Sequence, residues 1–240
     1  MPTKGVNFAL QTLSNQKKIA MTQKSKVAVI GLGSIGTTLA TNLVRGNRSI
    51  IIADRTAEKA KSLSVKLGNL AQPRDIAAAI KEADIIVFAI WFDAIKELFK
   101  TYATELEGKI IVDPSNPIAP DEKGGFKKII GKDQSAGQVL SSLVPKDAKL
   151  AKALGSLGAA SLANAAFQQP EKAVEFYAAD DTNINTAIED LIRDNGFEPV
   201  HIGGLDQSIR IEVFGDLHEF GALGKAITLK EAQELVQEQV

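Results

Sequence analysis

A short apolar run that leads directly into three glycines constrains this chain more than any other feature. Residues 27–36 read V-A-V-I-G-L-G-S-I-G, and a second apolar run, residues 50–53, ends at Asp54. This acid follows the last glycine by about 20 residues. A lone glycine triplet is weak evidence. A strand, a glycine turn, a helix and a second strand ending in an acid together predict a βαβ unit that binds a dinucleotide.

The three glycines have separate roles in such a unit. Gly31 permits a tight turn, Gly33 leaves room for a pyrophosphate to approach the backbone, and Gly36 lets the helix pack closely on its strand. A helix over 34–45 would direct its unpaired N–H groups and its positive dipole end at the phosphates. The alternative is a glycine-rich turn that binds nothing. The predicted phosphate contacts are Gly31, Gly33, Ser34, Ile35 and Gly36.

The residues after the second run bear on the choice between NAD and NADP. An acid there usually accepts a hydrogen bond from the ribose 2′-OH of NAD, whereas a neighbouring arginine accommodates the 2′-phosphate of NADP. An ionised Asp54 about 4 Å from that phosphate would cost about 4 kcal/mol at intermediate dielectric. Arg55 and Lys59 would offset the repulsion, and Thr56 would add a hydrogen bond. These cations favour NADP, although Lys59 would equally suit a solvated helix face.

Composition argues against several classes of function. The net charge of −1 gives no sign of nucleic-acid binding. The chain has no cysteine and only two histidines, so no disulfide, thiolate nucleophile or metal site is predicted. No apolar run approaches the roughly 20 residues of a membrane span. Residues 1–20 lack both arginine and the apolar core of a secretory signal, so we expect a mobile leader and a cytoplasmic protein.

Strand-like and helix-like segments alternate along the chain. This predicts an α/β fold of the Rossmann type, doubly wound, with a mainly parallel sheet and a helical C-terminal tail. We expect a dinucleotide-binding domain over 21–170 and an extension over 171–240 that continues the same sheet. Expected strands are 26–30, 49–53, 69–71, 84–90, 109–113, 149–154, 173–179 and 198–202. Expected helices are 34–45, 57–67, 75–82, 93–102, 135–143, 182–193 and most of 205–240, with 123–126 irregular.

The loops after the later strands supply the remaining candidate contacts. Ile90, Trp91 and Phe92 follow a buried strand, and Trp91 would either shield a cofactor ring or pack at the strand end. Ser115 and Asn116 would hydrogen-bond a ribose or carboxamide, or else form a turn.

Three other polar residues have both functional and structural interpretations. His201 is predicted to be structural. Arg210 would either meet an acidic tail of the second cofactor or form a surface salt bridge, and the salt bridge is favoured. His218, flanked by acids, is a weak candidate for catalysis.

Six segments, taken in order, carry a family resemblance. They are V-I-G-L-G-S-I-G, A-D-R-T-A-E-K-A (53–60), I-V-D-P-S-N-P (111–117), S-A-G-Q-V-L (135–140), K-A-L-G-S-L-G-A-A (152–160) and D-N-G-F-E-P-V (194–200). From residue 26 to about residue 215 the chain resembles the coenzyme F420-dependent NADP reductase family. It differs at Asp54, where that family typically has a small hydroxyl residue.

The resemblance implies hydride transfer between NADP(H) and F420 or a related flavin, FMN or FAD. The second ring would lie beside the nicotinamide, near 90–92, 115–117 and the small-residue run 155–160. It also implies a homodimer, to which the alanine-rich stretch 151–167 would contribute an apolar surface.

Two other functions remain open. Reduction of a small imine or carbonyl compound would require a proton donor, and the strand-end loops contain no evident one. Hydride transfer between two rings needs proximity and alignment more than an acid–base residue, so no catalytic side chain is predicted. A nicotinamide-nucleotide-binding sensor without turnover is the third possibility.

Overall fold

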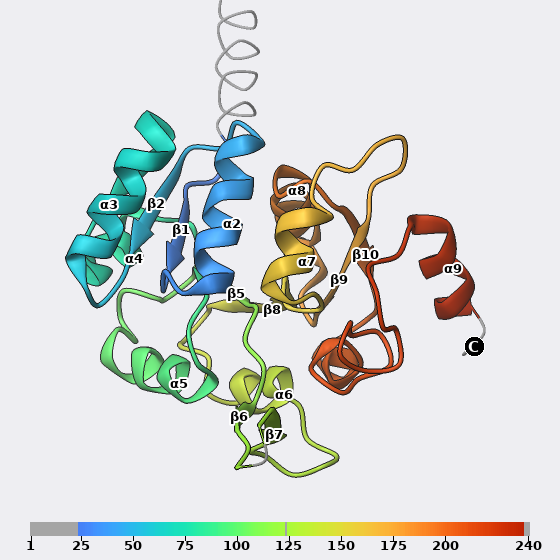
Figure 1. The fold of residues 1–240 in the computed structure, drawn as a ribbon. Helices are drawn as coiled ribbons and strands as arrows, with labels where there is room; N and C mark the ends of the chain where they lie inside the picture. The colour runs from blue at the N-terminus through green and yellow to red at the C-terminus, as the bar shows by residue number, and fades with distance from the viewer. Residues whose placement is uncertain (1–23, 123, 238–240) are drawn as a thin grey trace, which may run out of the picture.

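A single sheet of eight strands organises the molecule (Figure 1). The computed structural model describes residues 24–122 and 124–237. The strands of this sheet are β1 (Val27–Ile30), β2 (Ile50–Ala53), β3 (Ala71–Pro73), β4 (Ile85–Phe88), β5 (Ile110–Asp113), β8 (Lys149–Ala153), β9 (Val174–Ala179) and β10 (Glu198–His201). Their order is β10-β9-β8-β5-β4-β1-β2-β3, and all neighbours are parallel except β8 and β9. The predicted Rossmann-type fold with a mainly parallel sheet is therefore confirmed.

Helices cover both faces of the sheet, which explains why the strands read as continuous apolar runs. Every residue of β1, β2 and β4 is buried. One face is covered by α2 (Ser34–Arg45), α3 (Ala57–Leu67), α7 (Ala159–Asn164) and α8 (Asn185–Asp194). The other is covered by α4 (Ile76–Glu82), α5 (Phe92–Thr101) and α6 (Ala136–Ser141).

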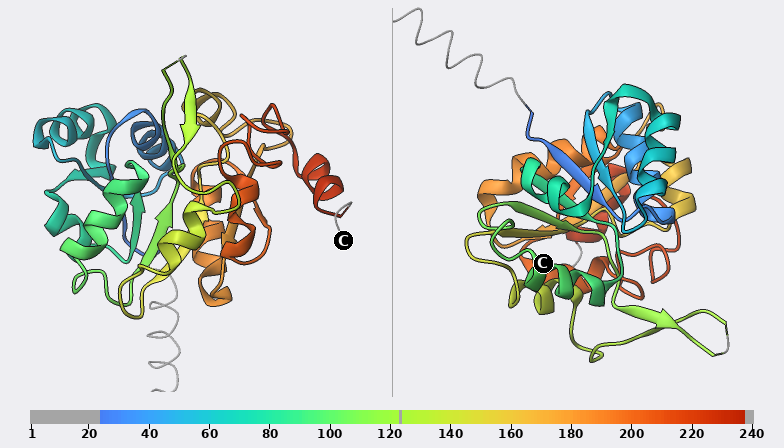
Figure 2. Two further views of the ribbon diagram at one scale, coloured as in Figure 1. Left: turned by 90° about the horizontal axis from the view of Figure 1, so that it is seen from below. Right: turned by 90° about the vertical axis from the view of Figure 1, so that its left-hand side faces the viewer.

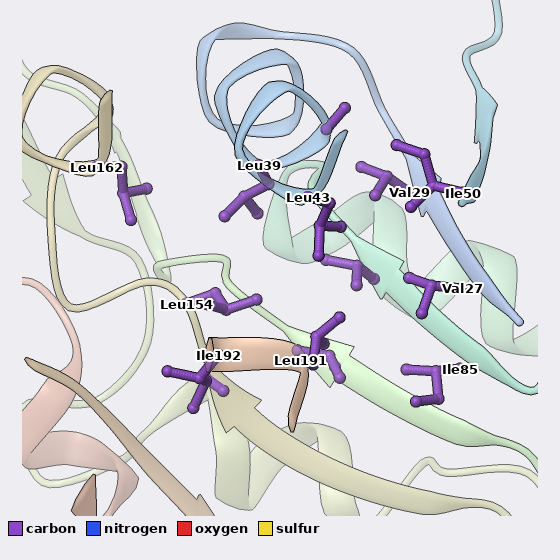
Figure 3. Close-up of a cluster of buried hydrophobic side chains, with 14 of the residues drawn as sticks. Val27, Val29, Leu39, Leu43, Ile50, Ile85, Leu154, Leu162, Leu191 and Ile192 are labelled. Carbon is purple, nitrogen blue, oxygen red and sulfur yellow. The ribbon is translucent and has the colours of Figure 1, made fainter. Parts of the chain in front are cut away.

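The core on the α2 face shows how the helices meet the sheet. Leu39 and Leu43 of α2 and Leu191 of α8 lie around Val27 and Val29 of β1, and none is more than 1% exposed (Figure 3). Burying one such side chain fully contributes about 1.5–3 kcal/mol. The amphipathic pattern of the helices is satisfied only by this sheet, so their packing positions the loops at its ends.

Several expected elements differ in the structure. The third strand begins only at Ala71, because Gly68 (φ +80°) ends α3 and a 3-10 turn over Gly68–Leu70 follows. Where irregular chain was expected, β6 (Ile118–Pro120) and β7 (Phe126–Lys128) form a hairpin that extends from the body of the molecule (Figure 2). Its two strands, I-A-P and F-K-K, have only three residues each, too few to show the apolar alternation by which a strand is recognised.

The C-terminal region is mostly not helical, contrary to expectation. A 3-10 helix covers Leu205–Ile211 and turns follow to residue 228; in the described part of this region, up to residue 237, only α9 (Leu229–Gln237) is α-helical. Tight turns account for this, since a Cβ on Gly221 would lie 1.8 Å from the carbonyl oxygen of Gly215.

The alanine-rich stretch that was expected to face a partner folds within the chain. It contains α7, and Asn42 of α2 donates a hydrogen bond to the Leu162 carbonyl. Within residues 24–122 and 124–237, no helix has the length and apolar character that a membrane span requires.

Candidate functional site

The parallel strands bring their following loops to one edge of the sheet, which we call the carboxyl edge. It comprises the loops 31–33, 54–56, 89–91, 114–117 and 154–158, after β1, β2, β4, β5 and β8. Because β9 runs antiparallel to β8, the beginning of β9 also reaches this edge. All the predicted cofactor contacts lie on these loops or on the helices that directly follow them. In open α/β sheets this edge is where ligands bind.

The three glycines of the first loop occupy three different environments. Gly31 has φ +93°, and a Cβ on it would lie 2.3 Å from the Ile90 side chain. A Cβ on Gly36 would lie 1.8 Å from the Gly31 carbonyl oxygen. Gly33 has an ordinary φ of −77°, and a Cβ there would have no atom within 4 Å. The fold therefore requires glycine at 31 and 36. At Gly33 the packing of the protein does not require glycine, and the missing side chain leaves open space in front of the loop.

Helix α2 begins at this open space. Its N-cap residue, Gly33, provides no side-chain hydrogen bond, and the first turn contains no acidic residue. Gly33 and Ser34 are exposed, while Ile35 is half-buried. The first N–H groups of a 12-residue helix and the positive end of its dipole thus face solvent at the carboxyl edge. This arrangement suits a phosphate group.

Asp54 connects the first two loops. Its Oδ2 accepts a hydrogen bond from the Leu32 N–H at 2.8 Å, and its Oδ1 accepts one from the Thr56 N–H at 2.9 Å. Arg55, Thr56 and Lys59 are exposed beside it. Within the described part of the chain, neither Arg55 nor Lys59 takes part in an ion pair. The carboxylate is thus engaged by the protein backbone, while two cations next to it are available to an anion.

The loop after β4 contains one exposed and one buried aromatic residue. Trp91 is 61% exposed and is the N-cap residue of α5. Phe92 is only 1% exposed and packs in the core, with the Lys96 ammonium 4.7 Å from its ring centroid. Ile90 is half-buried, against Gly31. Trp91 is therefore placed to meet a ligand, whereas the Phe92 ring stabilises the start of α5.

Ser115 and Asn116 lie at the carboxyl edge but make hydrogen bonds within the protein. The Ser115 N–H donates to Asp113 Oδ1 at 2.7 Å, and its buried hydroxyl has no partner. The Asn116 side-chain N–H donates to the Gly155 carbonyl at 3.4 Å, and its oxygen accepts from the Val213 N–H at 2.7 Å. Asn116 therefore joins the loops after β5 and β8 to the C-terminal region, and its amide has little capacity left for a ligand.

Sequence reasoning missed a buried charged cluster behind this loop. Lys152 is 1% exposed, and its ammonium lies 2.9 Å from Asp113 Oδ2 and also contacts the Ser115 carbonyl. Glu212, 2% exposed, accepts hydrogen bonds from the first N–H groups of α6, at Ala136 and Gly137. Burial raises the pKa of Glu212, and Lys152 opposes that rise. The only local signal was Lys152 between two alanines of β8, a strand that begins at another lysine, Lys149.

The histidines and Arg210 have structural partners. His218 is 1% exposed; its Nδ1 accepts from the Phe220 N–H at 2.9 Å, and it also bonds to the Gly155 backbone. Burial lowers the pKa of His218 to about 4, so it is neutral at pH 7. His201 stacks on Tyr177 and ends β10, whose reversed direction places it away from the carboxyl edge. Arg210 pairs with Asp216 at 2.9 Å, which is the predicted salt bridge.

Comparison with known proteins agrees with this geometry. Residues 26–117 match the family model described as NADP oxidoreductase coenzyme F420-dependent. Over 104 residues the chain is 32% identical to the F420-dependent NADP reductase of Methanocaldococcus jannaschii, covering 39% of this chain and 46% of that protein. Over 187 residues it is 27% identical to the metalloreductase STEAP3 of Rattus norvegicus, covering 78% of this chain and 36% of that protein.

A solved structure shows that the fold extends along nearly the whole chain. The hypothetical protein SMa0349 from Sinorhizobium meliloti superposes with a TM-score of 0.72 at 24% identity, covering 87% of this chain and 97% of that one. The chain spans less than half the length of the curated relatives that it matches. Residues 26–117, from β1 to the loop after β5, are therefore similar to the NADP oxidoreductase coenzyme F420-dependent family.

Proposed function

We propose that the chain is an NADP-dependent oxidoreductase that transfers a hydride between NADP(H) and coenzyme F420 or a related flavin. The observation that carries the proposal is the contrast among the three glycines. Gly31 and Gly36 are required by the packing, but Gly33 faces open space in front of an uncapped helix. A pyrophosphate that approaches this backbone accounts for Gly33 and for the free N–H groups of α2 together.

The surroundings of Asp54 support NADP over NAD. Each carboxylate oxygen already accepts a backbone hydrogen bond, so the acid is held toward the glycine loop. Arg55 and Lys59 are exposed next to it and would neutralise a 2′-phosphate. An NAD-specific site would instead use the acid to accept from the ribose 2′-OH. We therefore expect NADPH to bind more tightly than NADH.

The chemistry at the other end of the cofactor supports a second ring as the hydride partner. When bound, the nicotinamide supplies or accepts the hydride at its ring carbon. The chain's task is then to hold two rings in contact and to exclude water. Lys152 and His218 are buried and engaged in hydrogen bonds, so neither is available as a proton donor to a ligand. The exposed Trp91 offers a flat apolar surface at this end.

The deciding experiment pairs NADPH and NADH with F420, FMN and FAD under anaerobic conditions, following loss of nicotinamide absorbance. Rapid oxidation of NADPH with F420 is the expected result. Turnover with FMN or FAD alone would make the protein a flavin reductase. No turnover with any pair, despite intact nucleotide binding, would refute hydride transfer to these rings and leave a small-molecule reductase or a sensor.

Two variants test the nucleotide site itself. Gly33→Val should leave the fold intact, because its side chain enters open space, but should weaken NADPH binding at least tenfold. Lys59→Met should weaken NADPH binding while leaving NADH binding unchanged. Lys61→Met is the matched control. Lys61 is exposed on the same helix, and its ammonium lies 4.0 Å from a carboxylate oxygen of the exposed Glu58. Equal effects of Lys59→Met and Lys61→Met would contradict a role for Lys59 in 2′-phosphate binding.

A further inference from the structure

One carboxyl group is buried beneath the loop that follows β8. Glu175, the second residue of β9, is completely buried. Its Oε2 lies 2.7 Å from the Ser156 hydroxyl, and the Ser156 backbone also forms a hydrogen bond with this carboxyl group. Within residues 24–122 and 124–237, its Oε1 has no hydrogen-bond partner. Glu175 therefore holds one residue of the carboxyl edge, Ser156, at both its side chain and its backbone.

Among the residues that the structure describes, no cation compensates a charge at this position. Lys152 pairs with Ala178 across the β8–β9 ladder, so by strand alternation it lies on the opposite face of the sheet from Glu175. Its ammonium is already paired with Asp113. From the C-terminal side, Glu219 adds a second carboxylate, which accepts from the Gly158 N–H at 2.6 Å and from the Ser161 hydroxyl. An ionised Glu175 would therefore lose its hydration and be repelled by Glu219. A neutral carboxyl group loses far less hydration free energy on burial.

We propose that Glu175 is a neutral carboxylic acid that positions the loop 154–158 through Ser156, so that NADP(H) binding at the carboxyl edge requires its proton. The inference rests on the proposed nucleotide site, because this loop follows β8 beside the nicotinamide end. Glu175 touches the loop and not the ligand, so it is a positioning residue. Ser156 donates to this carboxyl group in either charge state. Ionisation would leave a charge on the unpartnered Oε1 and repel Glu219, which holds Gly158, so the loop would have to open for water to reach Oε1.

His218 and Tyr177, which lie near Glu175, titrate outside its range. Burial raises the pKa of Glu175 to about 8 and lowers that of His218 to about 4. Burial and the Glu189 carboxylate on α8 raise the pKa of Tyr177 well beyond its usual value. Helix α7 contains no ionisable side chain. On the side of β9 away from β8, Glu198 of β10 is the register partner of Val174, the residue before Glu175. A change in binding between pH 7 and pH 9 is therefore assigned to Glu175.

The test measures the dissociation constant of NADPH from pH 6.5 to 9.5 by nicotinamide fluorescence. For wild type we expect a nearly constant value up to about pH 7, about a twofold rise at pH 8 and about a tenfold rise by pH 9, as the neutral fraction falls. Glu175→Gln, which is neutral at every pH and whose amide oxygen can still accept from the Ser156 hydroxyl, should bind like wild type at pH 7 and show no pH dependence. Glu189→Gln, a neutral substitution on the adjacent α8, should keep the wild-type profile.

A second measurement covers the case in which Glu175→Gln folds poorly. Hydrogen exchange of the amides in 154–158, corrected for intrinsic rates, should show protection that falls above pH 8 in wild type while the strands stay protected. A pH-independent dissociation constant in wild type, or Glu175→Gln with the wild-type profile, would overturn the inference. Failure of NADPH to bind at any pH would instead refute the proposed nucleotide site.

Discussion

Replacing Lys152 by methionine tests the buried cluster behind the carboxyl edge. The substitution keeps the length of the side chain and its packing but removes the ammonium 2.9 Å from Asp113 Oδ2. Three groups of this cluster are nearly inaccessible, at 1% exposure for Lys152, 0% for Asp113 and 2% for Glu212. The variant therefore leaves two carboxyl groups in the interior without a cation.

The expected cost follows from desolvation. Removing one partner of a buried ion pair destabilises a protein by about 3–5 kcal/mol, because the remaining charge is uncompensated. Two carboxyl groups place this variant at the upper end of that range, a large part of the 5–15 kcal/mol typical of a domain. The double variant Lys152→Met/Asp113→Asn should recover a substantial part of the loss, since asparagine can still accept from the Ser115 N–H.

The loss should depend on pH in a defined direction. Burial raises the pKa of Glu212 and Lys152 opposes this, so removal of Lys152 raises it further. A carboxyl group with a raised folded-state pKa loses stability as pH rises, because the unfolded chain releases its proton first. The deficit of Lys152→Met should therefore be smaller at pH 5 than at pH 7.

Urea unfolding followed by circular dichroism measures both the loss of stability at pH 7 and its change with pH. Lys100→Met is the matched control, because Lys100 forms an ion pair with Glu97 in which both side chains are 70% exposed. That control should change stability little. A loss below about 1 kcal/mol for Lys152→Met at pH 7, or a deficit that grows as pH falls, would refute the assignment of a charged, paired Lys152.

Three further predictions concern the edge and its support. Gly36→Ala should destabilise the fold by at least about 1–3 kcal/mol in urea unfolding, because its Cβ would overlap the Gly31 carbonyl, whereas Gly33→Ala should unfold like wild type. Burial keeps the His218 imidazole neutral in the folded protein, so the unfolded chain binds an additional proton as pH drops from about 6.5 to 4. The free energy of unfolding should therefore fall over this range. An unchanged difference in unfolding free energy between wild type and His218→Gln across that range would contradict this. NADPH should quench the emission of Trp91, the only tryptophan, and lack of quenching despite NADPH binding would place the nicotinamide elsewhere.

The fold class and the nucleotide-binding loop could be predicted because their signals are local. The glycine spacing, the two apolar runs and Asp54 all lie within residues 27–54, and each role depends on neighbours in sequence. Most strands and helices were placed within a few residues for the same reason. The hairpin β6–β7 was missed because its strands have only three residues each, and the turns after Ile211 were missed because they depend on close contacts such as that of Gly221 with the Gly215 carbonyl, which carry no apolar periodicity.

The sequence by itself determined that apolar strands alternate with amphipathic helices and that a glycine turn opens the first helix, since these are properties of short segments. Only the tertiary structure decided that β9 and β10 run against the other strands, which brings Glu175 to the carboxyl edge and takes His201 away from it. It also decided that Lys152, Glu175, Glu212 and His218 are buried. Burial and pKa depend on which distant segments meet, and residues 60 positions apart in the chain contribute to the same cluster.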